Sequence, residues 1–139
     1  METYQQSLQF QPRGPGLLEI TGEVAEVVRA AGIGQGLCHV FLQHTSASLL
    51  IQENADPSAR ADLEAFFERL APTGAAWYTH TAEGPDDMPA HLRAALTQVS
   101  EQVPVVEGRL GLGTWQGLYL FEHRRRPGTR RVVVTVQGT

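Results

Sequence analysis

The chain has 139 residues and a globular composition, so a single domain over residues 1–139 can bury a sufficient core. Its formal net charge of −4 excludes a general attraction to nucleic acid or anionic membranes, and no apolar run approaches the roughly 20 residues of a membrane span. Because residues 1–6 lack the basic and apolar parts of an export signal and Cys38 is the only cysteine, we expect a cytoplasmic protein without disulfides.

The first predicted elements are a strand and a helix. Alternating apolar residues over 3–11 predict a half-buried strand, and the proline and glycine cluster at 12–16 predicts a turn. A helical pattern begins at Thr21, which we expect to be the N-cap, and ends at the glycines of 32–34. Its apolar face is formed by Val24, Val27, Val28 and Ala31.

Two apolar strands follow, predicted over 36–43 and 47–51, with a short polar segment between them. Because the first of them is apolar on both faces, we expect it to be covered on both sides and to be central in its sheet. The residues of its two faces are Cys38, Val40 and Leu42 on one side and Leu37 and Phe41 on the other.

The clearest helix of the chain begins at Asp56 and Pro57, a capping carboxylate followed by proline at the first helical position. Its apolar residues recur at helical spacing until a break at 72–74. They are Ala59, Leu63, Phe66, Phe67 and Leu70.

The C-terminal half is predicted as an irregular loop over 77–88, a short helix from Pro89, and three strands joined in part by a hairpin turn at 124–130. The strands are expected at 103–106, 118–122 and 131–137. Strands and about three helices without regular alternation predict an α+β fold, with a mixed, largely antiparallel sheet and helices on one face.

Histidines lie at the ends of several predicted elements. His44 follows a strand, His80 lies in the irregular loop and His91 falls in the first turn of a helix. There is no HExxH motif and no pair of histidines at helical spacing, so a metal site would be assembled from distant segments. The alternative for each histidine is a hydrogen-bonded structural role, which we favour for His39 inside a strand.

Several carboxylates border the same segments. Asp56 and Asp87 each precede a helix, and each either caps that helix or takes part in catalysis. Glu53 and Glu83 have no such structural alternative.

Arginine supplies all eleven basic residues, because the chain has no lysine. This excludes a Schiff-base lysine and a P-loop lysine, and it leaves arginine as the only permanently charged group for gripping an anion. Five arginines lie in or directly beside the turn at 124–130. Three roles are open for them: phosphate binding, exposure to solvent, or pairing with acidic groups of another subunit. They are Arg124, Arg125, Arg126, Arg130 and Arg131.

The glycine-rich segment 108–117 is not a nucleotide fingerprint, because it lacks the third glycine at the required spacing and precedes a strand. Its glycines either allow backbone N–H groups to approach an anion beside Thr114 and Trp115, or form a tight turn with Trp115 in the core.

Taken in order, five motifs resemble the YjbQ-like family, whose members are often described as secondary thiamine-phosphate synthases. The motifs are Gln43-His44-Thr45-Ser46-Ala47-Ser48-Leu49, Glu53-Asn54 with Asp56-Pro57, Glu83-Gly84 with Asp86-Asp87-Met88-Pro89-Ala90-His91, Gly113-Thr114-Trp115-Gln116-Gly117, and Glu122-His123-Arg124 followed by Arg130-Arg131. The resemblance covers nearly the whole chain.

This resemblance implies an α+β fold with a strongly curved sheet, and a homotrimer with sites near the subunit contacts. It also implies a weak activity that joins a pyrimidine diphosphate to a thiazole phosphate, releasing pyrophosphate, and a metal ion near the family histidines. Zinc is expected in preference to magnesium, because imidazole ligands favour it. The alternatives are a zinc-dependent hydrolase of a small phosphorylated metabolite, with Glu53 or Glu83 activating water, and a non-catalytic metabolite-binding module.

Carried over by motif, the site residues fall into three sets. The expected metal ligands are His44, His80 and His91. The expected catalytic residues are Glu53, Asn54, Ser46, Ser48, Asp87, Thr114, Trp115, Gln116 and His123. The expected substrate-binding residues are Arg124, Arg130 and Arg131, together with Trp115 and Thr114.

Overall fold

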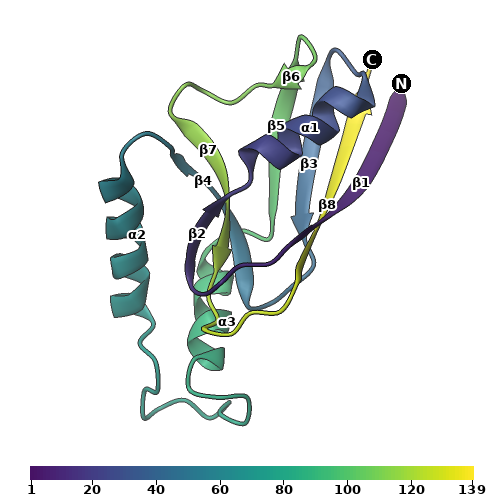
Figure 1. The fold of residues 1–139 in the computed structure, drawn as a ribbon. Coiled ribbons are helices and arrows are strands. Elements are labelled where there is room, and N and C mark those ends of the chain that lie inside the picture. The colour runs from purple at the N-terminus through teal and green to yellow at the C-terminus, as the bar shows by residue number, and fades with distance from the viewer.

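A computed structural model describes residues 1–139, which form one α+β domain with three helices and two curled antiparallel sheets (Figure 1). The strands are β1 (Glu2–Phe10), β2 (Gly16–Glu19), β3 (Gly36–Leu42), β4 (Ala47–Glu53), β5 (Ser100–Val106), β6 (Arg109–Leu110), β7 (Gln116–Glu122) and β8 (Arg130–Gly138). The helices are α1 (Thr21–Ala31), α2 (Pro57–Leu70) and α3 (Asp87–Leu96). The predicted fold class is confirmed. None of the three helices has both the length and the apolar character needed to cross a membrane.

The larger sheet has the strand order β1-β8-β3-β5-β6, and the smaller sheet has the order β2-β7-β4. Every pair of neighbouring strands in them is antiparallel. β3 lies between β8 and β5, so its predicted central position is confirmed. β7 and β8 belong to different sheets, so segment 124–130 is a crossing between sheets and the predicted hairpin is wrong.

The main core lies where α1 packs with the inner faces of the two sheets. Val24, Val27 and Val28 of α1 are buried there with Val134 of β8 and Leu120 of β7. Because side chains alternate along a strand, the intervening residues of β7 face the other way, where α2 covers the smaller sheet. That second cluster contains Leu17, Phe67, Tyr119 and Phe121. The helices therefore cover different faces, contrary to the expectation of one face.

The outer face of β3 is open within this chain. Leu37 is 50% exposed and Phe41 is 39% exposed, whereas the inward Cys38, Val40 and Leu42 are buried. The expectation that β3 is covered on both sides is therefore wrong for the isolated chain, because no helix packs against the outer face of the larger sheet.

The ends of the helices follow two different rules. Asp56 caps α2 as predicted, since its Oδ1 accepts the Ser58 N–H at 2.9 Å. The N-cap of α1 is Ile20, not Thr21, and the Thr21 hydroxyl instead accepts the Leu118 N–H at 2.9 Å. Thr21 therefore ties α1 to β7 rather than capping the helix.

The start of α3 differs from the prediction by two residues. The helix begins at Asp87 rather than at Pro89, and no side chain caps it. Asp87 is therefore inside the helix, and its predicted alternative as a cap is wrong. This shift places Asp87 and His91 one helical turn apart on the same face.

Candidate metal centre

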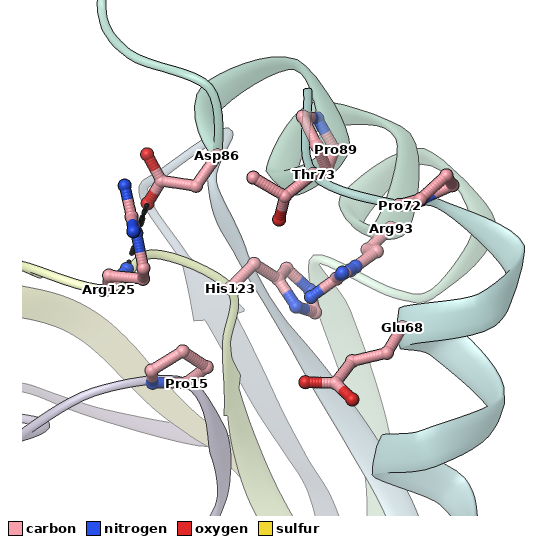
Figure 2. Close-up of a pocket in the computed structure, with 9 residues that line it drawn as sticks. All are labelled: Pro15, Glu68, Pro72, Thr73, Asp86, Pro89, Arg93, His123 and Arg125. Atoms are coloured by element: carbon pink, nitrogen blue, oxygen red, sulfur yellow. Dashed lines mark hydrogen bonds and ion pairs between the residues drawn. The ribbon is translucent and has the colours of Figure 1, made fainter. Parts of the chain in front are cut away.

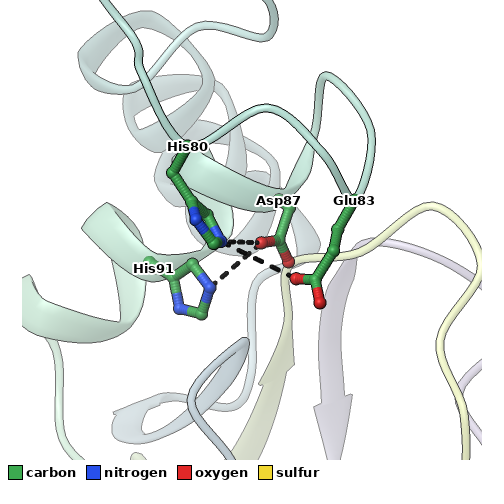
Figure 3. A group of neighbouring side chains, drawn as sticks. All are labelled: His80, Glu83, Asp87 and His91. Atoms are coloured by element: carbon green, nitrogen blue, oxygen red, sulfur yellow. Dashed lines mark hydrogen bonds and ion pairs between the residues drawn. The ribbon is translucent and has the colours of Figure 1, made fainter.

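Four side chains near the start of α3 form a compact group. Asp87 and His91 come from the helix, and His80 and Glu83 come from the loop that precedes it (Figure 3). One ligand atom from each lies within 4.8 Å of the others. Asp87 is buried, whereas His80 and Glu83 are exposed, so the cluster has an anchored side and a side open to solvent.

Both histidines point their Nε2 atoms at the same carboxylate oxygen. Asp87 Oδ2 lies 2.8 Å from His80 Nε2 and 3.1 Å from His91 Nε2. Burial tends to raise the pKa of Asp87, but the side chains of Glu83 and His80 and the charges of His91 and Arg124 lower it below its ordinary value. The carboxylate is therefore anionic at neutral pH.

The orientation of His91 is determined by a backbone carbonyl. Its Nδ1 lies 3.1 Å from the Thr45 carbonyl oxygen, which can only accept, so Nδ1 is assigned as the protonated nitrogen. In the neutral ring, Nε2 then presents a lone pair to the anionic Asp87 Oδ2. Two acceptors at this distance need a cation between them, either a proton that makes the ring an imidazolium or a metal ion. A carbonyl on the second ring nitrogen is the usual outer partner of a metal-binding histidine.

Arg124 holds the acidic side of the cluster in place. Its Nη1 donates to Asp87 Oδ1 at 2.5 Å, its Nε donates to Asp86 Oδ2 at 3.3 Å, and its Nη2 donates to the Glu83 carbonyl oxygen at 3.0 Å. The guanidinium therefore faces groups of its own chain, where it positions the cluster. Its expected direct contact with substrate stays a prediction.

The structure places the third predicted metal ligand elsewhere. His44 is outside the four-residue cluster, and its Nε2 accepts the Arg131 N–H at 2.9 Å. Burial, together with the charges of Arg130 and Arg131, lowers the pKa of His44. Within one chain, His80 and His91 are therefore together and His44 is separate.

Arg130 is also committed to a partner. It is buried, and its Nε and Nη2 donate to the two carboxylate oxygens of Glu122 at 2.6 and 2.5 Å. Its Nη2 also donates to the Ser46 carbonyl oxygen at 3.3 Å. Of the three arginines predicted to bind substrate, only Arg131 is exposed with no bond to its guanidinium.

Ser48 of β4 and His123, which follows β7, form a buried pair. Ser48 Oγ lies 2.9 Å from His123 Nε2, and both residues are almost completely buried. Burial, with the neighbouring charges of Arg93 and Arg130, lowers the pKa of His123 to about 3. The ring is therefore neutral at physiological pH.

The remaining predicted residues lie at a third location. Glu53 Oε2 accepts the N–H groups of Ala55 and Asp56, at 3.2 and 2.8 Å, and so shapes the turn before α2. A separate pocket of about 660 Å³ is lined by Asn54, Thr114 and Gln116, among others. Trp115 is 65% exposed, so the predicted alternative that places it in the core is wrong.

Sequence reasoning named all four residues of the cluster but gave two of them other roles, with Asp87 among the catalytic residues and Glu83 as a residue that activates water. It did not assign Glu83 to the metal set, and it had no means of finding the Thr45 carbonyl. Asp87 and His91 are four residues apart, which is the spacing of neighbours on one helix face. Sequence analysis did not recognise this pair, because it started the helix at Pro89 rather than at Asp87. Arg93, which lies behind the cluster, was not singled out at all.

The fold and the site together define an α+β protein with a histidine and carboxylate cluster at the start of its last helix. A family model described as "UPF0047 protein YjbQ-like" matches residues 6–139. The chain belongs to this family. It is 52% identical to the UPF0047 protein of Synechocystis sp., covering 97% of this chain and 92% of the relative. It is 42% identical to the UPF0047 protein YjbQ of Escherichia coli O157:H7, covering 97% of this chain and 98% of the relative.

Solved structures agree over nearly the full chain. A YbjQ-like protein of unknown function from Sulfolobus solfataricus superposes with a TM-score of 0.90 at 26% identity, covering 99% of both chains. A conserved hypothetical protein from Thermus thermophilus gives a TM-score of 0.85 at 32% identity, covering 95% of this chain and 99% of the other. None of these names states an activity.

Proposed function

We propose that His80, Glu83, Asp87 and His91 bind a divalent metal ion, and that the protein is a metal-dependent enzyme acting on a small phosphorylated metabolite. One observation carries the proposal: ligand atoms of the four side chains lie within 4.8 Å of one another, and inside that group the Nε2 lone pair of His91 faces the anionic Asp87 Oδ2. A metal ion satisfies both acceptors. Two imidazoles and two carboxylates suit zinc better than magnesium. Glu83 and His80 are exposed, so water or substrate can reach this side of the cluster and take the place of one of the four ligands, as a catalytic zinc site requires.

The surroundings favour a phosphorylated substrate. A pocket of about 580 Å³ adjoins the cluster and is lined by Glu83, Arg124, Arg125 and Arg126, among others. A bound metal ion would act as a Lewis acid toward phosphate oxygens. Arg125 and Arg126 would bind the phosphate at the rim, while Arg124 keeps Asp87 oriented through its 2.5 Å bond.

Thiamine-phosphate formation is the first reaction to test, as a side activity suggested by the family resemblance. In this reaction the thiazole nitrogen forms a bond to the methylene carbon of the pyrimidine, and the carbon–oxygen bond to pyrophosphate breaks. Both electrons of that bond leave with pyrophosphate. The arginine rim would stabilise this departing charge, and the site would hold the two substrates in line.

Hydrolysis of a phosphorylated metabolite is the second candidate, in which His80, Asp87 and His91 would hold the metal ion and Glu83 would leave the ligand set to act on water. Its Oε2 lies 3.7 Å from His80 Nε2, and the side chain is largely exposed. This carboxylate can accept a proton from water at Oε2, as a general base requires.

The metal site is tested by measuring zinc content and affinity after purification without chelators. We expect about one zinc per wild-type chain, and an affinity at least about tenfold weaker in His91→Gln. His44→Gln is the matched control, because His44 lies outside the cluster, and it should keep the wild-type affinity. Loss of zinc from His44→Gln but not from His91→Gln would contradict the assignment.

The same variants test the activity. Thiamine phosphate and released phosphate are measured with wild-type protein, with His91→Gln and with His44→Gln. The proposal expects turnover to disappear with His91→Gln and to survive in His44→Gln. Full activity in a folded His91→Gln variant would place the chemistry elsewhere, and binding without any turnover would identify a metabolite-binding module.

We also propose that the protein assembles as a homotrimer. The outer face of the larger sheet exposes Leu37, Phe41 and Val106, which no helix of the chain covers. Packing this face against two further copies would remove apolar surface from water. It would also bring exposed residues such as Trp115 near another subunit.

A further inference from the structure

A second pocket lies on the opposite side of α3 from the metal centre. It has a volume of about 370 Å³ and sits between the end of α2, the first turns of α3 and the end of β7 (Figure 2). No large apolar side chain lines it. Arg93 and His123 form its inner wall, and Arg125 and Asp86 stand on one side (Figure 2).

Two polar atoms of the inner wall are buried without a partner. They are Arg93 Nε and His123 Nδ1. Arg93 Nη2 is anchored, since it donates to the Ala71 carbonyl oxygen at 2.8 Å, and this bond holds the guanidinium beside the His123 ring (Figure 2). Buried polar atoms are almost always paired, so these two indicate a missing partner rather than a packed core.

The chemistry of these two atoms indicates that the missing partner is a hydrogen-bond acceptor. Arg93 Nε can only donate. The His123 ring is neutral because burial keeps its pKa far below the ordinary value. If the Ser48 hydroxyl donates to Nε2 across their 2.9 Å contact, the ring proton lies on Nδ1 and becomes a second donor beside Arg93.

The charges around the pocket also favour an anion. Asp86 Oδ2 accepts the Arg125 backbone N–H and the Arg124 Nε–H. Its carboxylate is thus an anion already satisfied by those donors, at 2.9 and 3.3 Å. Arg125 Nε lies 4.0 Å from Asp86 Oδ2 at the side of the pocket, whereas no carboxylate lies within ion-pair distance of Arg93, so the Arg93 charge is left for a bound anion.

We propose that this pocket is a second ligand site, which binds a phosphate-type oxyanion between Arg93, Arg125 and the Nδ1–H of His123. The volume exceeds that of a single water molecule, so the anion can carry a small organic group. The site stands independently of the proposed metal chemistry. It is nevertheless connected to the metal centre, because Arg124 contacts both Asp86 and Asp87.

The test uses inorganic phosphate and full-length protein stripped of metal with a chelator, so that the metal centre cannot capture the anion. Calorimetry measures the affinity, and nitrogen NMR follows the ring signals of His123. We expect saturable binding that moves the Nδ1 signal. Arg93→Gln should weaken binding by about tenfold or more, because a charged hydrogen-bond donor is lost.

Arg69→Gln is the matched control, because Arg69 is an exposed arginine of α2 that lines neither this pocket nor the one beside the metal centre. It should bind phosphate within about twofold of the wild type. Acetate, an anion with only two oxygens, should bind more weakly than phosphate.

Three results would overturn the proposal. The first is absence of saturable phosphate binding, which would leave only water in the pocket. The second is a loss of binding in Arg69→Gln rather than in Arg93→Gln. The third is equal affinity for acetate, which excludes the phosphate class. If Arg93→Gln fails to fold, the test is the NMR signal of His123 in the wild-type protein. An unchanged Nδ1 signal at saturating phosphate would contradict the proposal.

Discussion

His123 is held in its neutral form inside the protein, and the energetic cost of this burial depends on pH. Its pKa is about 3 in the folded chain, against about 6.5 for an ordinary histidine. Below about pH 6.5 the unfolded chain therefore takes up a proton that the folded chain does not bind. Stability is lost as the pH falls through this window, because protonation favours the unfolded state.

This predicts a slope of about 1.4 kcal/mol per pH unit from His123 alone between about pH 6 and pH 4. Urea unfolding at several pH values measures it. His123→Gln, which keeps a side-chain amide near Ser48, should remove most of the slope. His44→Gln should remove a smaller part, since burial also lowers the pKa of His44 but the ring is less enclosed. An unchanged slope in His123→Gln would show that the ring titrates normally.

At the scale of elements, α3 contributes residues to both candidate sites because its faces point in different directions. Asp87 and His91, one turn apart, belong to the candidate metal cluster. Asp86, at the N-terminal end, and Arg93, two turns further along, line the second pocket. A short helix therefore separates the two candidate sites and holds each at a defined position.

The ends of α1 offer a paired test of glycine conformation. Gly32 closes the helix with φ at +66° in the left-handed region, whereas Gly22 lies inside the first turn without a positive φ. A Cβ at either position meets nothing within 4 Å, so backbone conformation alone decides the outcome.

We expect Gly32→Ala to destabilise the protein by about 1 kcal/mol, because a side chain disfavours the left-handed conformation. Gly22→Ala should instead stabilise it by about 0.5 kcal/mol, because alanine loses less entropy on entering a helix. Denaturant midpoints measure both changes. The same sign for the two substitutions would contradict this account.

Across the whole molecule, one buried ion pair joins the two sheets. Glu122 ends β7 of the smaller sheet, and Arg130 begins β8 of the larger sheet. The carboxylate of Glu122 also accepts the N–H groups of His123 and Arg124, at 3.1 and 3.0 Å. The pair therefore closes the crossing between the sheets.

Removing one partner of this ion pair should strongly lower the free energy of unfolding. Arg130→Met leaves Glu122 charged and buried, and we expect a loss of about 3–5 kcal/mol in the free energy of unfolding. The double variant Arg130→Met with Glu122→Gln should recover part of this loss, because the amide oxygen keeps the backbone bonds without the charge. Urea unfolding compares them. A loss below about 1 kcal/mol in the single variant would show that the ion pair contributes little to stability.

Assembly is tested at the same scale. Light scattering should give a mass about three times the 15.2 kDa of one chain. Leu37→Glu, on the open face of the larger sheet, should dissociate the trimer by placing a charge in the apolar contact. Leu70→Glu is the control, because Leu70 is similarly exposed but lies on α2. Dissociation by Leu70→Glu alone would place the interface on the helix.

Local patterns in the sequence determined most of the elements. The apolar periodicity and the cap at Asp56 defined α2, and the glycine at 32 marked the end of α1. These features depend on residues a few positions apart, so they are readable without a structure. The family motifs likewise named His80, His91 and Asp87 as candidates.

Only the tertiary structure decided how those candidates meet. It separated His44 from His80 and His91, and it committed Arg130 to Glu122. It also revealed the pocket beside Arg93. The physical reason is that strand pairing and loop return are non-local, so residues adjacent in a motif can face opposite sides of an element while partners come from distant segments. The sequence thus named the polar residues of the candidate centre, and the packing of α3 against the ends of the sheets selected which of them share a site.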